Sequence, residues 1–120
     1  MIEEIVRGVF TIEHRVAEGK NAVIFGDRDA WAVDTGSDAS EGVRTVDLIR
    51  AHGYLPNRLI YTHGHGDHIL GSAPFAGADI FAHRLTPVEM RRLLPTLAAC
   101  RLYGERIRCP TGLANSYLSQ

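Results

Sequence analysis

Four side chains able to bind a metal lie within six consecutive residues, in the order His63, His65, Asp67 and His68. Imidazole is the commonest biological metal ligand, and carboxylate often accompanies it on zinc or iron. The residues that separate the first three are glycines, which adopt backbone conformations that a β-carbon forbids and so let neighbouring side chains converge. Surface loops seldom concentrate four such groups, so this spacing indicates a metal site.

The stretch Thr62-His63-x-His65-x-Asp67-His68 resembles the signature of the metallo-β-lactamase superfamily. The stretch Val33-Asp34-Thr35-Gly36 also resembles that family, in which an aspartate ends an inner strand beside the metal loop. The likeness is clearest over residues 1–95, and residues 96–120 form a tail that the likeness leaves unassigned. The resemblance implies an αββα sandwich, an α/β fold of layered helices and sheets, of which residues 1–120 form a partial domain, the N-terminal half.

The resemblance also implies a role for each residue of the loop. His63 and His65 would bind a first metal, and Asp67 and His68 a second, so the expected cofactor is one or two zinc ions, with iron or manganese as alternatives. Asp67 is a catalytic candidate as well, because a carboxylate not fully committed to metal can transfer a proton. Members are mostly metal-dependent hydrolases, in which metal-activated water attacks an ester, thioester, lactam, phosphodiester or sulfate ester.

The second half of the family's site has no counterpart here. The family draws a further histidine for each metal, and a bridging aspartate, from that half, whereas this sequence has no histidine after His83 and no aspartate after Asp79. Three interpretations stay open: a hydrolase, an iron-dependent oxidoreductase of the same fold, and a non-catalytic half-domain that binds metal. Whether residues 1–120 alone form an enzyme stays open too. The expected partners are a small-molecule substrate and, because a half-domain exposes apolar faces, a second copy or a chain that supplies the missing half.

Two further residues are candidates for the surroundings of the metal. Asp34 would either orient a ligand histidine by a hydrogen bond or cap the next turn. His83 ends a predicted strand, where a single histidine is more often a structural or surface residue than a functional one. His14 lies in a polar, turn-like segment and is assigned no role. Cys100 and Cys109 are interpreted as free cysteines.

Composition excludes several classes of function. The chain has 120 residues, of which 45% are hydrophobic and 22% charged, as in one globular domain. A net charge of −1 gives no electrostatic basis for binding nucleic acid or an anionic membrane. The acidic start leads into no apolar run, and no stretch approaches the roughly 20 apolar residues of a membrane span. A cytoplasmic location is therefore expected.

Hydrophobic periodicity predicts the elements that precede the loop. Strands are expected over 5–12, 21–25 and 30–33, with a turn between the last two. A helix should come next, because Asp38 and Glu41 have the spacing of a capping box. Gly53 then has the position of a C-terminal stop.

The same signals predict the elements around the loop and after it. A strand over 58–61 should deliver the metal loop at its carboxyl end, where open α/β folds generally place their sites. A short helix is expected over 67–73 and a strand over 78–82. A last helix should start with Thr86 as N-cap and continue to residue 98, with a kink at Pro95.

Overall fold

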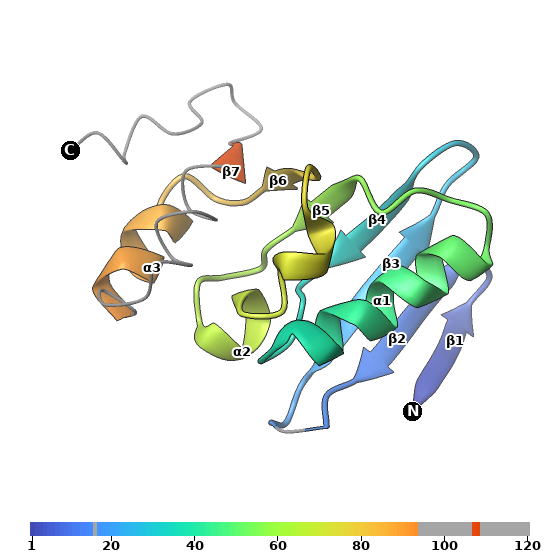
Figure 1. The fold of residues 1–120 in the computed structure, drawn as a ribbon, viewed down its shortest axis with the longest axis horizontal. Coiled ribbons are helices and arrows are strands. Elements are labelled where there is room, and N and C mark those ends of the chain that lie inside the picture. The colour runs from blue at the N-terminus through green and yellow to red at the C-terminus, as the bar shows by residue number, and fades with distance from the viewer. Residues whose placement is uncertain (16, 94–106, 109–120) are drawn as a thin grey trace.

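The computed structural model describes residues 1–15, 17–93 and 107–108. These residues form one sheet of seven strands, whose spatial order follows the sequence, with α1 lying across one face (Figure 1). The strands are β1 (Ile2–Val6), β2 (Val9–Glu13), β3 (Lys20–Phe25), β4 (Ala30–Val33), β5 (Arg58–Ile60), β6 (Asp79–Phe81) and β7 (Ile107–Arg108). The helices are α1 (Ala39–Ala51), α2 (Gly66–Ile69) and α3 (Thr86–Leu93), with a 3₁₀ turn at Ala73–Phe75.

The direction of the strands changes at β4. Strands β1 to β4 form an antiparallel meander, whereas β4 to β7 pair in parallel. Val33 pairs with Ile60, and Ile60 pairs with Phe81, so three parallel strands end at the same edge of the sheet. The loops after these strands therefore begin side by side. A mixed sheet with packed helices confirms the α/β prediction.

The N-terminal strand predicted over 5–12 is wrong in its bounds. The segment is a hairpin, in which Val6 of β1 pairs with Val9 of β2 across a two-residue turn. Gly8 makes this turn with φ of +82°, a conformation that favours glycine, and its carbonyl accepts the Phe25 N–H at 2.8 Å. Because a two-residue turn leaves the alternation of apolar and polar residues unbroken, periodicity alone does not reveal it.

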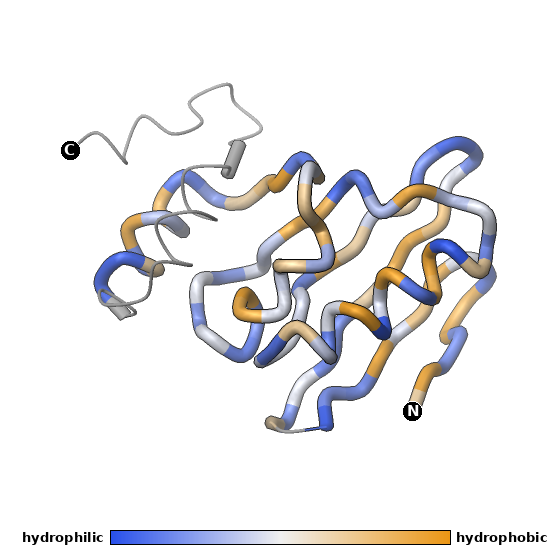
Figure 2. The backbone as a smooth tube through the Cα atoms, in the orientation of Figure 1, coloured by the Kyte–Doolittle hydropathy of each residue, from blue (hydrophilic) through white to orange (hydrophobic). Residues whose placement is uncertain are grey.

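The core lies between α1 and one face of the sheet. Figure 2 shows apolar segments of the strands beneath the helix. Each fully buried aliphatic side chain contributes about 1.5–3 kcal/mol relative to exposure. The main residues are Val23, Ala32, Leu59 and Ile80 from the sheet and Val46 and Ile49 from α1.

Helix α1 begins as predicted but uses its acidic residues differently. Asp38 is the N-cap, and its carboxylate accepts the N–H of Glu41 at 3.1 Å. The reciprocal half of a capping box is not made, because Glu41 is buried and its Oε1 accepts the N–H of Arg15 at 3.2 Å. Glu41 therefore ties the β2–β3 loop to α1. The helix ends before Gly53, whose φ of +84° confirms the predicted stop.

The other face of the sheet carries apolar side chains with less cover. Because alternate residues of a strand face opposite sides, Ile24 and Trp31 lie on the face away from α1, and these two residues pair across β3 and β4. Ile24 is 43% exposed. The Trp31 ring lies 5.5 Å from that of Phe81 and 5.2 Å beneath the guanidinium carbon of Arg58. We call this face, defined by Ile24, Trp31 and Phe81, the outer face.

Two of the later helix predictions differ from the structure. The helix expected over 67–73 ends at Ile69, because Gly71 leaves the helical path to donate its N–H to the carbonyl of Gly36 at 3.1 Å. Helix α3 includes Thr86, which was expected to precede it. Its predicted continuation through Pro95 lies outside the described residues. Within the described ranges, no helix has both the length and the apolar character needed to cross a membrane.

Candidate metal centre

The loop that carries the four predicted ligands begins directly after β5. Tyr61 is buried, donates its N–H to the Phe81 carbonyl at 3.0 Å, and its hydroxyl contacts Ser72 Oγ. The N–H of Asp34, at the end of β4, bonds the Ile60 carbonyl at 2.8 Å. The loop therefore lies at the carboxyl ends of parallel strands, as predicted.

The side chains of the four predicted ligands lie near one another, but among the described residues it is His63 and His68, with Asp34, whose possible ligand atoms converge. The ring centroids of His63 and His65 are 4.6 Å apart, and those of His63 and His68 are 4.2 Å apart. Asp67 Oδ2 lies 3.5 Å from Nε2 of His68. The imidazoles of His63 and His68 are half-buried, whereas His65 is exposed. Such a cluster has the chemistry of a divalent-metal site, and its partial burial limits competition from water.

Asp34 is the structural centre of this cluster. It is 2% exposed and has a φ of +61°, which aspartate tolerates better than most residues. Its Oδ1 accepts the Thr62 N–H at 2.8 Å, and its Oδ2 lies 2.8 Å from His68 Nδ1. An ionised carboxylate only accepts hydrogen bonds, so His68 carries its proton on Nδ1. Nε2 of His68 is then left as the nitrogen that can bind metal.

Thr62 links Asp34 to a second histidine, His63, and so affects the tautomer of that ring as well. Its hydroxyl donates to Asp34 Oδ2 at 2.7 Å and lies 2.8 Å from His63 Nδ1. A hydroxyl has one proton, so towards His63 the Thr62 oxygen accepts and Nδ1 donates. Nε2 of His63 is therefore also free for metal. One buried carboxylate thus fixes the tautomer of two histidines, directly for His68 and through a hydroxyl for His63.

Asp34 is closer to a supporting residue than to a ligand. One ligand atom from each of Asp34, His63 and His68 falls within a group spanning 4.8 Å, so these three could enclose an ion. The Asp34 oxygens, however, already take three hydrogen bonds, which leaves little capacity for a metal. These bonds reach residues 62 and 68 and not the turn directly after Asp34. Of its two predicted roles, orientation of a ligand fits better than capping.

The backbone of His68 is held by hydrogen bonds from Thr35. Its carbonyl accepts both the N–H of Thr35 at 2.9 Å and the Thr35 hydroxyl at 3.1 Å. Glycines allow the segments to approach, since a β-carbon on Gly42 would lie 1.9 Å from the Gly71 carbonyl oxygen and one on Gly71 would lie 2.1 Å from that of Thr35. The end of α2 is therefore packed directly against the start of α1.

His14 belongs to the surroundings of this site, although no role is predicted for it from the sequence. It is 7% exposed, its Nε2 lies 2.7 Å from Asn21 Oδ1, and Asn21 in turn donates to Thr45 Oγ1 at 3.3 Å. The His14 ring packs edge-on against that of His68, with centroids 5.7 Å apart. The signal in the sequence is the alternation of Ile12 and His14, which continues the buried face of β2.

His83 lies apart from this network. It is exposed, and its Nδ1 accepts the N–H of Leu85 at 3.1 Å, in the turn before α3. This contact fits the structural interpretation of His83.

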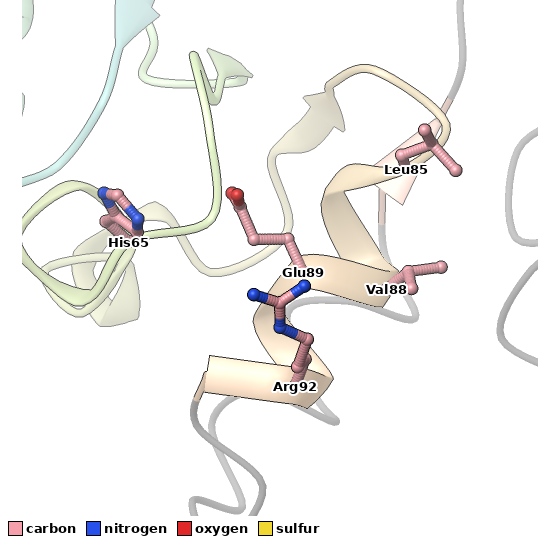
Figure 3. A pocket seen from close by; sticks show the side chains of 5 residues that line it. All are labelled: His65, Leu85, Val88, Glu89 and Arg92. Carbon is pink, nitrogen blue, oxygen red and sulfur yellow. The ribbon is translucent and has the colours of Figure 1, made fainter.

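A pocket of about 270 Å³ lies beside the loop (Figure 3). Its walls combine apolar and charged groups. The lining residues are His65, Leu85, Val88, Glu89 and Arg92.

Comparison with known families identifies the class of this protein. The family model described as metallo-beta-lactamase superfamily matches residues 17–108. The chain therefore belongs to the metallo-β-lactamase superfamily. Among curated proteins, none matches this sequence.

Solved structures of metallo-β-lactamases share the fold. TMB-1 is 29% identical with a TM-score of 0.65, and the alignment covers 78% of this chain and 47% of that one. A metallo-β-lactamase from Hirschia baltica is 18% identical with a TM-score of 0.69, over the same shares. FIM-1 from Pseudomonas aeruginosa is 16% identical with a TM-score of 0.62, covering 77% and 45%. The chain thus spans about half the length of these structures, in agreement with the prediction of a partial sandwich.

Proposed function

We propose that this chain carries one half of the catalytic metal site of a metal-dependent hydrolase. The observation that supports the proposal most directly is the hydrogen-bond network of Asp34, which leaves Nε2 of both His63 and His68 available to a metal. Imidazole and carboxylate groups suit zinc, and the related FIM-1 structure is described as a mono-zinc form. Bound zinc would supply a Lewis acid and a water of lowered pKa for hydrolysis.

We assign a separate role to each residue of the loop. His63 and His65 would hold the first metal, and Asp67 and His68 would hold a second. Asp67 is also the candidate of these residues to take up a proton, because its carboxylate is part-exposed.

The substrate approaches from the side of α3. The pocket there contains His65 together with the apolar side chains of Leu85 and Val88, so a small molecule in it would lie against the metal loop. The substrate is proposed to be an ester, thioester, lactam, phosphodiester or sulfate ester.

Full activity requires ligands from outside residues 1–120. We place the missing half on the outer face, where Ile24 and Trp31 offer an apolar surface on the metal loop's own sheet. Residues 1–120 alone are expected to bind metal and to show no appreciable hydrolysis.

The metal content of the purified protein tests this proposal. We would determine bound zinc by elemental analysis in residues 1–120, beside His63→Ala and Asp67→Ala, with His83→Ala as the matched control. The expected result is zinc that a chelator removes easily, reduced in the two loop variants and unchanged in the control. Equal zinc in all four proteins would contradict the metal loop. Two tightly held ions per chain would mean that further ligands complete the site, and turnover by this chain would then be expected.

A further inference from the structure

Helix α3 contacts the middle of the metal loop. Glu89 Oε1 accepts the N–H of Gly64, which joins His63 to His65, although the two partners are 25 positions apart in the sequence. In Figure 3 the Glu89 carboxylate points from α3 towards the segment of the loop that carries His65. Within the described part of the chain, this carboxylate forms no ion pair, so its hydrogen bond to the loop is its main interaction.

The contact is close on the side of the loop as well. Gly64 is buried, and a β-carbon built on it would lie 2.9 Å from both Glu89 Oε1 and Met90 Cγ, and 3.1 Å from the Met90 nitrogen. Met90 itself is fully buried in the core. The loop backbone therefore packs against a buried part of α3. The Gly64 N–H donates to a protein acceptor at a place where water has little access.

Two carboxylates from different elements hold alternate N–H groups of the loop. Asp34, at the end of β4, accepts from Thr62, and Glu89, in α3, accepts from Gly64. His63 lies between these two anchored residues, and His65 comes directly after the second. Carboxylate acceptors make stronger hydrogen bonds to N–H groups than neutral ones do, so each anchor restrains the backbone on one side of a proposed ligand.

We propose that Glu89 is a positioning residue that sets the spacing of His63 and His65 before any metal binds. Its carboxylate also adds negative charge beside the loop, which favours a cation there. The proposal rests on the proposed function only in treating these histidines as metal ligands. The restraint on the Gly64 backbone is a property of the metal-free chain.

The test compares Glu89→Ala and Glu89→Gln with Glu3→Ala, a control that removes an exposed carboxylate from β1. Zinc affinity is measured by competition with a chromogenic chelator, and the Gly64 amide is followed by NMR in metal-free protein. We expect Glu89→Ala to weaken zinc binding about 10- to 100-fold, as loss of such supporting contacts does, and to speed exchange of the Gly64 amide with solvent. Glu89→Gln keeps an acceptor of the same shape and should recover part of both effects.

Each outcome bears on one proposal. Unchanged zinc affinity in Glu89→Ala, or a Gly64 amide that exchanges no faster than in the control, would overturn the positioning role. If Glu89→Gln and Glu89→Ala lost equal amounts of zinc affinity, the charge of Glu89 would matter and its hydrogen bond would not. This result would also overturn the positioning role. If the wild-type chain binds no zinc, the proposed function fails, and the Gly64 amide still decides whether Glu89 restrains the loop.

Discussion

Asp34 Oδ2 lies 2.8 Å from His68 Nδ1 and also accepts the hydroxyl proton of Thr62 at 2.7 Å. The Thr62 oxygen in turn accepts a hydrogen bond from the Nδ1–H of His63. One carboxylate thus fixes the same tautomer in two imidazoles that are five positions apart in the sequence. Metal affinity depends on this choice, because a nitrogen that carries a proton cannot bind a metal.

Replacing Asp34 by asparagine should reverse the tautomer of His68. Asparagine keeps the shape of the side chain and tolerates the φ of +61°, so the fold should persist. Its amide nitrogen, however, is a donor, and a donor facing His68 Nδ1 places the imidazole proton on Nε2. We expect zinc affinity to fall about 10- to 100-fold. Long-range ¹H–¹⁵N NMR of the metal-free protein would show the proton moving between the two ring nitrogens.

Asp47→Asn in α1 is the matched control for this substitution, since Asp47 is exposed and its exchange makes the same change of charge. It should alter neither the tautomer nor the affinity. An unchanged His68 tautomer in Asp34→Asn would show that some other group fixes the ring.

Thr62 should matter through its hydroxyl alone. Thr62→Val has nearly the same shape but removes the oxygen that accepts from His63 Nδ1, so the tautomer of His63 is no longer fixed. We expect about a tenfold loss of zinc affinity, at the lower end of the range for groups that support metal ligands. Thr62→Ser retains the hydroxyl and should bind zinc almost as the wild type does. Equal affinity of the valine and serine variants would mean that the relay has no effect.

The metal loop could be located from the sequence because its information is local. The proposed ligands from His63 to His68 lie in one short segment, and the strand before it has a plain apolar pattern. The sequence also places Asp34 near the metal loop but leaves its role open, since the deciding partners, Thr62 and His68, are 28 and 34 positions away.

The features that the sequence does not reveal depend on contacts between distant segments. His14 is assigned no role because its neighbours are polar, yet it packs on His68 of α2 from the end of β2. Glu89 is interpreted as a residue of a helix start, and its bond to Gly64 becomes visible only when α3 is placed beside the loop. The turn at Gly8 escapes prediction for another reason, because it does not interrupt the alternation of the strands.

Asp38 should make the stability of the chain depend on pH in acid. Hydrogen bonds from the Ser40 hydroxyl and the Glu41 N–H hold the pKa of the Asp38 carboxyl below its ordinary value. A carboxyl whose pKa is lowered by folding stabilises the folded state above its unfolded pKa of about 3.9, and this contribution disappears as the pH falls through the folded pKa. At neutral pH, Asp38→Ala should lower the melting temperature by a few degrees, as loss of an N-cap does.

The difference between Asp38→Ala and the wild type should therefore shrink as the pH is lowered from about 5 to about 2. Thermal unfolding followed by circular dichroism at several pH values measures it. Other carboxyl groups titrate in both proteins and largely cancel in the difference. A gap in melting temperature that stays constant across this range would mean that the anionic form of Asp38 contributes nothing.

The outer face should drive self-association of residues 1–120. Ile24 is 43% exposed and pairs with Trp31, whose ring adjoins that of Phe81, so apolar side chains lie next to one another on this face of the sheet. Sedimentation velocity over a range of concentrations should show larger species, and the emission of Trp31, the only tryptophan, should shift to the blue as they form. Burial of apolar surface is the driving force, because the net charge of −1 opposes association only weakly.

Ile24→Lys should suppress this association, since burying the outer face would then bury an unpaired charge. Val43→Lys is the matched control, because Val43 is also 43% exposed but lies on α1 and not on the outer face. It should associate as the wild type does. If Ile24→Lys and Val43→Lys behaved alike, the outer face would not be the surface that associates, and our placement of the missing half there would lose its support.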